Sequence, residues 1–216
     1  MAQELNDVPI RLPVETVVFD LGGVLIDWNP DYVYRHIYPD PVRRQWFFEN
    51  ICTHEWNLEQ DAGRPLAEAT AEKVAEFPEY AEQIQAFYGR WEEMLGEAIA
   101  PNVALLKQLR AQGNVRLYAL TNWSQETFPI ALDRFDFLQW FEGIVVSGLE
   151  GVIKPYREIY EILLSRYSIP AATSVFIDDN YLNVEGARAA GMQALHYTEA
   201  DQLRKDLAPL LSSSTP

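Results

Sequence analysis

From residue 101 onward, short apolar runs alternate with segments of helical periodicity, and this alternation constrains the fold more than any other feature of the chain. We expect strands at residues 115–120, 143–147, 174–177 and 193–197, and helices at residues 102–112, 126–135, 157–167 and 184–190. Strands and helices at this spacing form right-handed βαβ units around a parallel sheet. An apolar run within residues 14–26 adds a first strand and its turn. The predicted fold class is α/β, with a three-layer parallel sheet.

Residues 30–99 have a different character from the rest of the chain. They are rich in Trp, Tyr, Phe and Glu, and their periodicity predicts helices at residues 41–51, 65–77 and 80–95. We therefore expect a small all-α insertion of about four short helices after the first strand. The predicted core comprises residues 14–29 and 100–210, and residues 1–13 and 211–216 are expected to be flexible termini.

Composition excludes several classes of protein. The net charge of -15 argues against a nucleic-acid partner, because affinity for nucleic acids depends largely on Lys and Arg contacts to phosphate. No apolar run approaches the length of a membrane span, and no secretory signal is visible, so we expect a cytoplasmic protein without membrane association. A single cysteine, Cys52, excludes a disulfide framework within the chain and is expected to be a packing residue.

Polar or ionic residues follow four of the predicted strands. They are Asp20, Thr121 with Asn122, Lys154, and Asp178 with Asp179. Ligands of open parallel sheets bind beyond the carboxyl ends of the strands, so these side chains are expected to meet in one site. A helix N-cap explains a single acid of this kind, but not four such strand ends in one chain.

The residue types at these strand ends suit phosphoryl transfer. A carboxylate such as Asp20 can attack phosphorus and form an aspartyl-phosphate. Thr121, Asn122 and Lys154 supply the hydroxyl, amide and ammonium donors that a phosphoryl group needs. Asp178 and Asp179 beside Asp20 would form an oxygen site suited to Mg²⁺, which would also relieve the repulsion between three carboxylates.

These motifs resemble those of the haloacid dehalogenase (HAD) superfamily of hydrolases. The similar segments are residues 20–24, 120–122, 154–155 and 176–180, and residues 183–191 also resemble the family. The resemblance is to the subgroup with a small helical C1 cap (subfamily IA, variant 3-like), and to its glucose-1-phosphatase-like and epoxide hydrolase N-terminal phosphatase-like members. It implies a Rossmann-like core and identifies the insertion at residues 30–99 as a helical cap.

The resemblance also implies a role for each site residue. Asp20 would be the nucleophile, Thr121 and Asn122 would bind the transferring group, and Lys154 would neutralise both nucleophile and phosphate. The implied Mg²⁺ ligands are Asp20, Asp179, Asp178 through a water molecule, and the backbone carbonyl of Gly22.

Gly22 is the departure from the family pattern. Phosphatases of this superfamily usually carry an aspartate there as general acid and base, a contribution worth about 10²- to 10⁴-fold in rate. Asp27 and the cap residue His36 are two candidate substitutes, although a turn or helix-entry role is the favoured interpretation of Asp27.

The predicted function is Mg²⁺-dependent hydrolysis of a small phosphomonoester, such as a sugar phosphate, through an aspartyl-phosphate at Asp20. The first alternative is a metal-independent 2-haloacid dehalogenase, whose halide leaving group needs no proton, but the pair Asp178 and Asp179 favours a metal-dependent enzyme. The second alternative is a catalytically weak HAD-like binding protein. A phospho-acceptor receiver domain is disfavoured, because its acid pair comes first in the chain and it has no inserted cap. The sequence does not predict the oligomeric state.

Overall fold

A five-stranded parallel sheet forms the centre of the protein. The computed structural model describes residues 10, 11 and 13–211. The strands run in the order β5-β4-β1-β6-β7, and all neighbours are parallel. They are β1 (Thr16–Phe19), β4 (Arg116–Thr121), β5 (Gly143–Val146), β6 (Ser174–Asp178) and β7 (Gln193–His196). The predicted α/β class with a parallel sheet is therefore confirmed.

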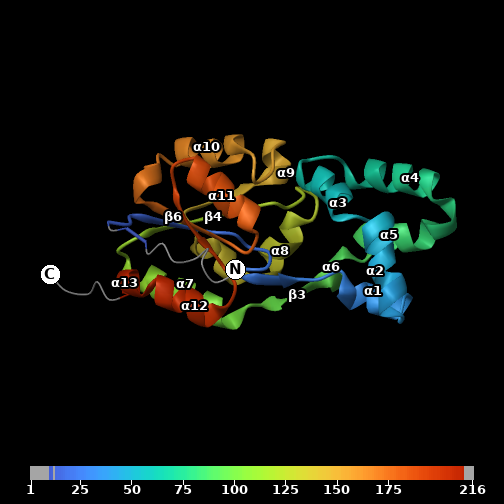
Figure 1. Ribbon diagram of the computed structural model, residues 1–216, viewed down its shortest axis with the longest axis horizontal. Helices are drawn as coiled ribbons and strands as arrows, with labels where there is room; N and C mark the ends of the chain where they lie inside the picture. The colour runs from blue at the N-terminus through green and yellow to red at the C-terminus, as the bar shows by residue number, and fades with distance from the viewer. Residues whose placement is uncertain (1–9, 12, 212–216) are drawn as a thin grey trace.

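Helices cover both faces of this sheet, as Figure 1 shows. Side chains alternate along β1, so that Val17 and Phe19 belong to one hydrophobic cluster and Val18 to another. The first cluster includes residues of α7 (Ala100–Gln112), α8 (Phe128–Arg134), α12 (Ala200–Asp206) and α13 (Ala208–Leu211). The second includes residues of α10 (Arg157–Arg166) and α11 (Tyr181–Ala189). The result is the three-layer arrangement that the alternating pattern predicts.

Residues 31–94 form the helical cap, which has a hydrophobic core of its own and lies beyond one end of the sheet (Figure 1). The helices are α1 (Asp31–Ile37), α2 (Pro41–Asn50), α3 (His54–Asp61), α4 (Leu66–Glu76), α5 (Ala81–Gly89) and α6 (Trp91–Met94). The structure thus has six α-helices here rather than about four. Asp40 and Thr53 cap α2 and α3 by accepting hydrogen bonds from Val42 N and Trp56 N. Cys52 is a buried free thiol in this core, as expected.

The two connections between the cap and the sheet pair with each other. They form an antiparallel ribbon of β2 (Ile26–Trp28) and β3 (Leu95–Ala98). The predicted helix over residues 80–95 is therefore wrong at its end, because α5 stops at Gly89, α6 at Met94, and Leu95 already belongs to β3. Pairing with β2, a contact distant in sequence, overrides the helical periodicity of this segment.

The remaining elements are short. They are α9 (Ser147–Glu150) and the 3₁₀ helices η1 (Pro78–Tyr80), η2 (Asp136–Trp140) and η3 (Ala171–Thr173). Among the described residues, no helix combines the length and apolar character needed to cross a membrane. The termini predicted to be flexible fall largely outside the described residues.

Candidate active site

A cavity of about 500 Å³ lies where the carboxyl ends of the strands face the cap. The sheet side of its wall includes Asp20, Gly22, Thr121, Asn122, Lys154 and Asp179. The cap side includes residues from α3, α5 and α6. The structure thus brings six of the seven predicted site residues to one cavity wall, and the seventh, Asp178, lies fully buried in contact with Lys154.

Asp20 occupies the centre of this arrangement because β1 is the central strand. The register pairs Phe19 with Ala119 of β4 and with Ile177 of β6, so the next residue, Asp20, emerges between the ends of both neighbours. Its Oδ1 accepts a hydrogen bond from Leu21 N at 2.7 Å and contacts Lys154 Nζ at 2.8 Å. Oδ2 receives no hydrogen bond from the described residues.

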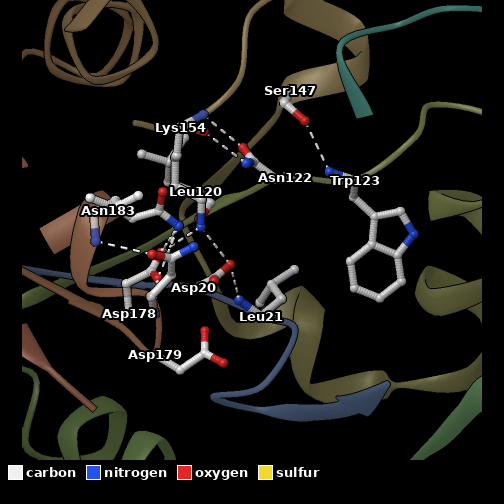
Figure 2. Close-up of polar contacts among 12 residues, drawn as sticks. Asp20, Leu21, Leu120, Asn122, Trp123, Ser147, Lys154, Asp178, Asp179 and Asn183 are labelled. Atoms are coloured by element: carbon white, nitrogen blue, oxygen red, sulfur yellow. Dashed lines mark hydrogen bonds and ion pairs between the residues drawn. The ribbon is translucent and has the colours of Figure 1, made fainter. Parts of the chain in front are cut away.

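Lys154 is a buried cation whose three N–H groups all have acceptors (Figure 2). Its Nζ lies 2.8 Å from Asp20 Oδ1, 2.7 Å from Asp178 Oδ2 and 3.2 Å from the carbonyl oxygen of Leu120. Burial alone would lower the pKa of Lys154, but Asp178 and Asp20 outweigh that effect and raise it. Lys154 is therefore a fixed positive charge beside Asp20.

The side chain of Asn122 holds Lys154 in place. Its Oδ1 accepts a hydrogen bond from Lys154 N at 2.8 Å, and its Nδ2 donates to Lys154 O at 3.0 Å (Figure 2). The amide group is thus largely committed to the backbone of the segment that carries the lysine. Phosphate binding by Asn122 stays a prediction, as does the role of Thr121, which is buried at the end of β4.

Three carboxylates, including that of Asp20, lie close together at the strand ends. One oxygen each from Asp20, Asp178 and Asp179 can be chosen so that all three lie within 4.8 Å of one another. Burial raises the pKa of Asp20 well above its usual range, opposed by Lys154 and reinforced by Asp178 and Asp179. Burial and then Asp178 likewise raise the pKa of Asp179. A further cation beside Lys154 would relieve the repulsion that Asp20 and Asp179 experience from neighbouring carboxylates.

The donor set fits a divalent metal ion. Three carboxylates against one ammonium leave a formal charge of -2, which one Mg²⁺ would neutralise. Both oxygens of Asp178 already accept hydrogen bonds, from Asn180 N, Asn183 Nδ2 and Lys154 Nζ, which suits an indirect rather than a direct contact to the ion. The carboxylate of Asp179, by contrast, lies against Gly23, where any side chain would collide with it.

The two candidate replacements for the acid missing at Gly22 do not reach the cavity. Asp27 accepts a hydrogen bond from Tyr32 Oη and packs against Gly96, so it belongs to the β2–β3 ribbon. His36 is exposed on α1 and does not line the cavity. Gly22 itself lines the cavity, and a Cβ at this position would meet no atom within 4 Å. The first side-chain carbon of an aspartate would therefore have room there.

One polar face of α3 was not anticipated from the sequence. His54, Asn57, Leu58 and Asp61 all line the cavity, at positions i, i+3, i+4 and i+7 of the helix. Residues at this spacing share one helix face. The spacing is readable in the sequence, but nothing in the sequence alone indicates that this face turns toward Asp20.

Comparison with known proteins agrees with this geometry. The family model for haloacid dehalogenase-like hydrolases matches residues 14–191. The chain belongs to this family. The HAD-like chain is 29% identical over 186 residues to the sesquiterpene phosphatase astK of Aspergillus oryzae, covering 86% of this chain and 91% of that one. It is 24% identical over 189 residues to the phosphorylated carbohydrates phosphatase of Thermotoga maritima, covering 85% and 84%.

A solved structure shares the fold of this HAD-like hydrolase. It is a HAD family enzyme from Bacteroides thetaiotaomicron, a mutant in complex with magnesium and inorganic phosphate. The TM-score is 0.67 at 20% identity, and the match covers 86% of this chain and 95% of the other. At this identity the likeness establishes the architecture, and the chemistry of the site has to be argued from its own residues.

Proposed function

We propose that the protein is a Mg²⁺-dependent phosphatase that hydrolyses a small phosphomonoester through an aspartyl-phosphate at Asp20. The observation that carries the proposal is the charge cluster at the strand ends, in which one lysine balances only one of three carboxylates, those of Asp20 and Asp178 being buried and that of Asp179 exposed. The bound Mg²⁺ would supply positive charge for the nucleophile and the phosphate oxygens. Asp20, Asp179 and the carbonyl of Gly22 would hold it directly, and Asp178 through water.

The protein's own residues have separate tasks in this scheme. Lys154 Nζ fixes Asp20 Oδ1, which leaves Oδ2 directed at the phosphorus atom. The same ammonium reduces the repulsion between the nucleophile and an anionic ester. Asn183 and Asn180 hold Asp178, and Asn122 holds Lys154, so the charged groups are positioned before substrate binds.

The acid pair also distinguishes phosphatase from dehalogenase chemistry. Displacement of a halide by Asp20 needs no metal and no proton donor, and two further carboxylates would only repel a carboxylate substrate. A cluster with a formal charge of -2 supports a metal-dependent reaction instead. The weak-binding-protein alternative stays open because of Gly22, and it is tested by turnover.

The cavity wall favours a substrate with an apolar alcohol. Its aromatic and aliphatic members are Trp28, Leu58, Tyr88, Trp91, Trp123 and Leu182. Each buried CH₂ of a ligand contributes about 0.8 kcal/mol to the free energy of binding, so such a wall binds a hydrocarbon chain more tightly than a hydroxylated ring. The named activity of the Aspergillus oryzae relative supports a terpenyl monophosphate, and that of the Thermotoga maritima relative supports the predicted sugar phosphate.

The test is phosphate release by the purified full-length chain from an aryl phosphate, from farnesyl monophosphate and from glucose 6-phosphate, each with Mg²⁺ or with EDTA. We expect release that EDTA abolishes, that Asp20→Asn abolishes, and that Asp27→Asn leaves unchanged as a matched acid-to-amide control. We expect kcat/KM at least about 10-fold higher for the farnesyl ester, from two or more buried CH₂ groups. Metal-independent halide release from 2-haloacids without phosphate release would refute the proposal.

A further inference from the structure

The proposed reaction needs a proton that the sheet side of the site does not supply. When an ordinary alcohol leaves phosphorus, its oxygen must be protonated, and the group that usually provides this proton is missing at Gly22. Lys154 does not supply it, because its ammonium group is held by the carboxylates of Asp20 and Asp178. The inference about the source of this proton rests on the proposed function.

The leaving group must point toward the cap. In an in-line displacement, the attacking and leaving oxygens lie on opposite sides of phosphorus. Asp20 attacks from the sheet edge, so the bond that breaks faces the cap wall of the cavity, to which α3 contributes the largest share of lining residues, alongside α5 and α6. The acids on that wall among the described residues are Glu55 and Asp61.

Asp61 is anchored at the junction of cap and core. It is the last residue of α3, and its carbonyl oxygen accepts a hydrogen bond from Ser147 Oγ at 2.5 Å, at the start of α9. Its Oδ2 accepts a hydrogen bond from Asn57 Nδ2 at 3.1 Å, one turn earlier in the same helix. The backbone N–H of Ser124, in the segment after β4, also binds the carboxylate. Figure 1 shows α3 and α9 facing each other across this junction.

This environment keeps a proton on Asp61 near neutral pH. Burial raises its pKa to about 7, although the Ser124 N–H and the Lys154 ammonium lower it. Tyr88 is adjacent but is neutral and donates to Asn57 Oδ1 and Gln60 Oε1. By contrast, Glu55 is exposed in the first turn of α3, where hydrogen bonds to its own backbone N–H and to Thr53 lower its pKa. The remaining titratable group on this helix face is the exposed His54.

We propose that Asp61, from the cap, is the general acid and base of the reaction in place of the residue missing at Gly22. In the first step, the bond from Asp20 Oδ2 to phosphorus forms, the bond from phosphorus to the alcohol oxygen breaks, and the Asp61 proton passes to that oxygen. In the second step, water attacks phosphorus from the side the alcohol left, its proton passes to the Asp61 carboxylate, and the bond to Asp20 breaks. Inorganic phosphate leaves, and both side chains return to their starting states.

The experiment is the dependence of kcat/KM on the leaving group in Asp61→Asn. The amide keeps an acceptor for Ser124 N–H but carries no acidic proton. We expect a loss of about 10²- to 10⁴-fold for an alkyl phosphate and less than about 10-fold for 4-nitrophenyl phosphate, whose leaving group needs no proton. Asp27→Asn should show no such difference. Adding Gly22→Asp to Asp61→Asn should restore at least about 10-fold of the alkyl activity, because position 22 lines the cavity and a Cβ there meets no atom within 4 Å.

Other outcomes distinguish a failure of the role of Asp61 from a failure of the proposed function. Equal losses for both substrates, no loss, or a selective loss in Glu55→Gln instead would overturn the role of Asp61. Wild-type protein without Mg²⁺-dependent turnover of any ester would overturn the proposed function itself. If Asp61→Asn does not fold, wild-type pH profiles decide: alkyl phosphate turnover should decline above pH about 7, whereas 4-nitrophenyl phosphate turnover should not. Coinciding profiles would refute the inference.

Discussion

Gly23 is the position where a single methyl group tests the metal site most directly. Its φ of +74° is a left-handed conformation, and a Cβ there would overlap with Asp179 Oδ2 and lie 2.7 Å from Asp179 Cγ. A normal contact needs more than 3 Å, so in Gly23→Ala the carboxylate must move by about 1 Å. Because Mg²⁺ demands ligands near 2.0–2.1 Å, a shift of that size would prevent Asp179 from acting as the proposed ligand.

Two effects of Gly23→Ala are expected, and a second glycine separates them. The left-handed conformation costs a non-glycine residue about 1–2 kcal/mol, which lowers the melting temperature by about 2–8 °C in a chain of this size. Gly113 has a similar φ of +64°, and a Cβ there would have no atom within 4 Å, so Gly113→Ala should show this loss alone. Only Gly23→Ala should also weaken Mg²⁺ binding, by at least about 10-fold.

Calorimetric titration with Mg²⁺ and thermal unfolding followed by circular dichroism measure both quantities without relying on activity. The expected pattern is similar melting temperatures for the two variants in EDTA, and a rise on adding Mg²⁺ that is reduced in Gly23→Ala only. If both variants bind Mg²⁺ as tightly as the wild type, Asp179 is not a ligand. The reasoning from the Gly23 contact would then be wrong.

Three further predictions concern stability. Lys154→Met should lower the free energy of unfolding by about 3–5 kcal/mol, because it leaves Asp20 and Asp178 buried without their cation. Urea titrations measure this loss, and a value below about 1 kcal/mol would contradict the prediction. The pKa of Asp61 is raised to about 7 in the folded protein, against about 3.9 in the unfolded chain. The stability of the wild type relative to Asp61→Asn should therefore fall as pH rises from about 4 to 7 and level off above. A stability difference that does not change with pH would contradict the raised pKa. Gly148→Ala places a Cβ 2.5 Å from Gln125 N and should cost about 1–3 kcal/mol in thermal unfolding, whereas Gly89→Ala, with nothing within 4 Å, should be neutral or stabilising.

The sequence predicts the sheet side of the site well because each residue there is fixed by the strand that precedes it. Asp20, Thr121 and Asp178 follow from apolar runs with clear ends, and the parallel arrangement brings those ends together. Lys154 is placed by a longer loop, and it is predicted because that loop follows the strand expected at residues 143–147. These inferences need only local pattern and the topology of a parallel sheet.

The cap side escapes prediction because its geometry depends on contacts distant in sequence. Asp61 reaches the cavity through a hydrogen bond between its carbonyl and Ser147, 86 residues later. A short helix such as α3 gives a weak periodic signal, and the partner of β3 is almost 70 residues away in β2. The sequence shows which residues of α3 share a face, but not what that face meets.

The β2–β3 ribbon has a consequence for how a substrate enters. Because the two chain connections to the cap are hydrogen-bonded to each other, they would bend together if the cap moved away from the sheet. Two hydrogen bonds join α3 and α4 to the core, from Ser147 Oγ to Asp61 O and from Leu66 N to Glu126 Oε1. A movement that broke these two bonds would carry Asp61 away from Asp20. Under the proposed mechanism, an aspartyl-phosphate at Asp20 would then persist until Asp61 returned.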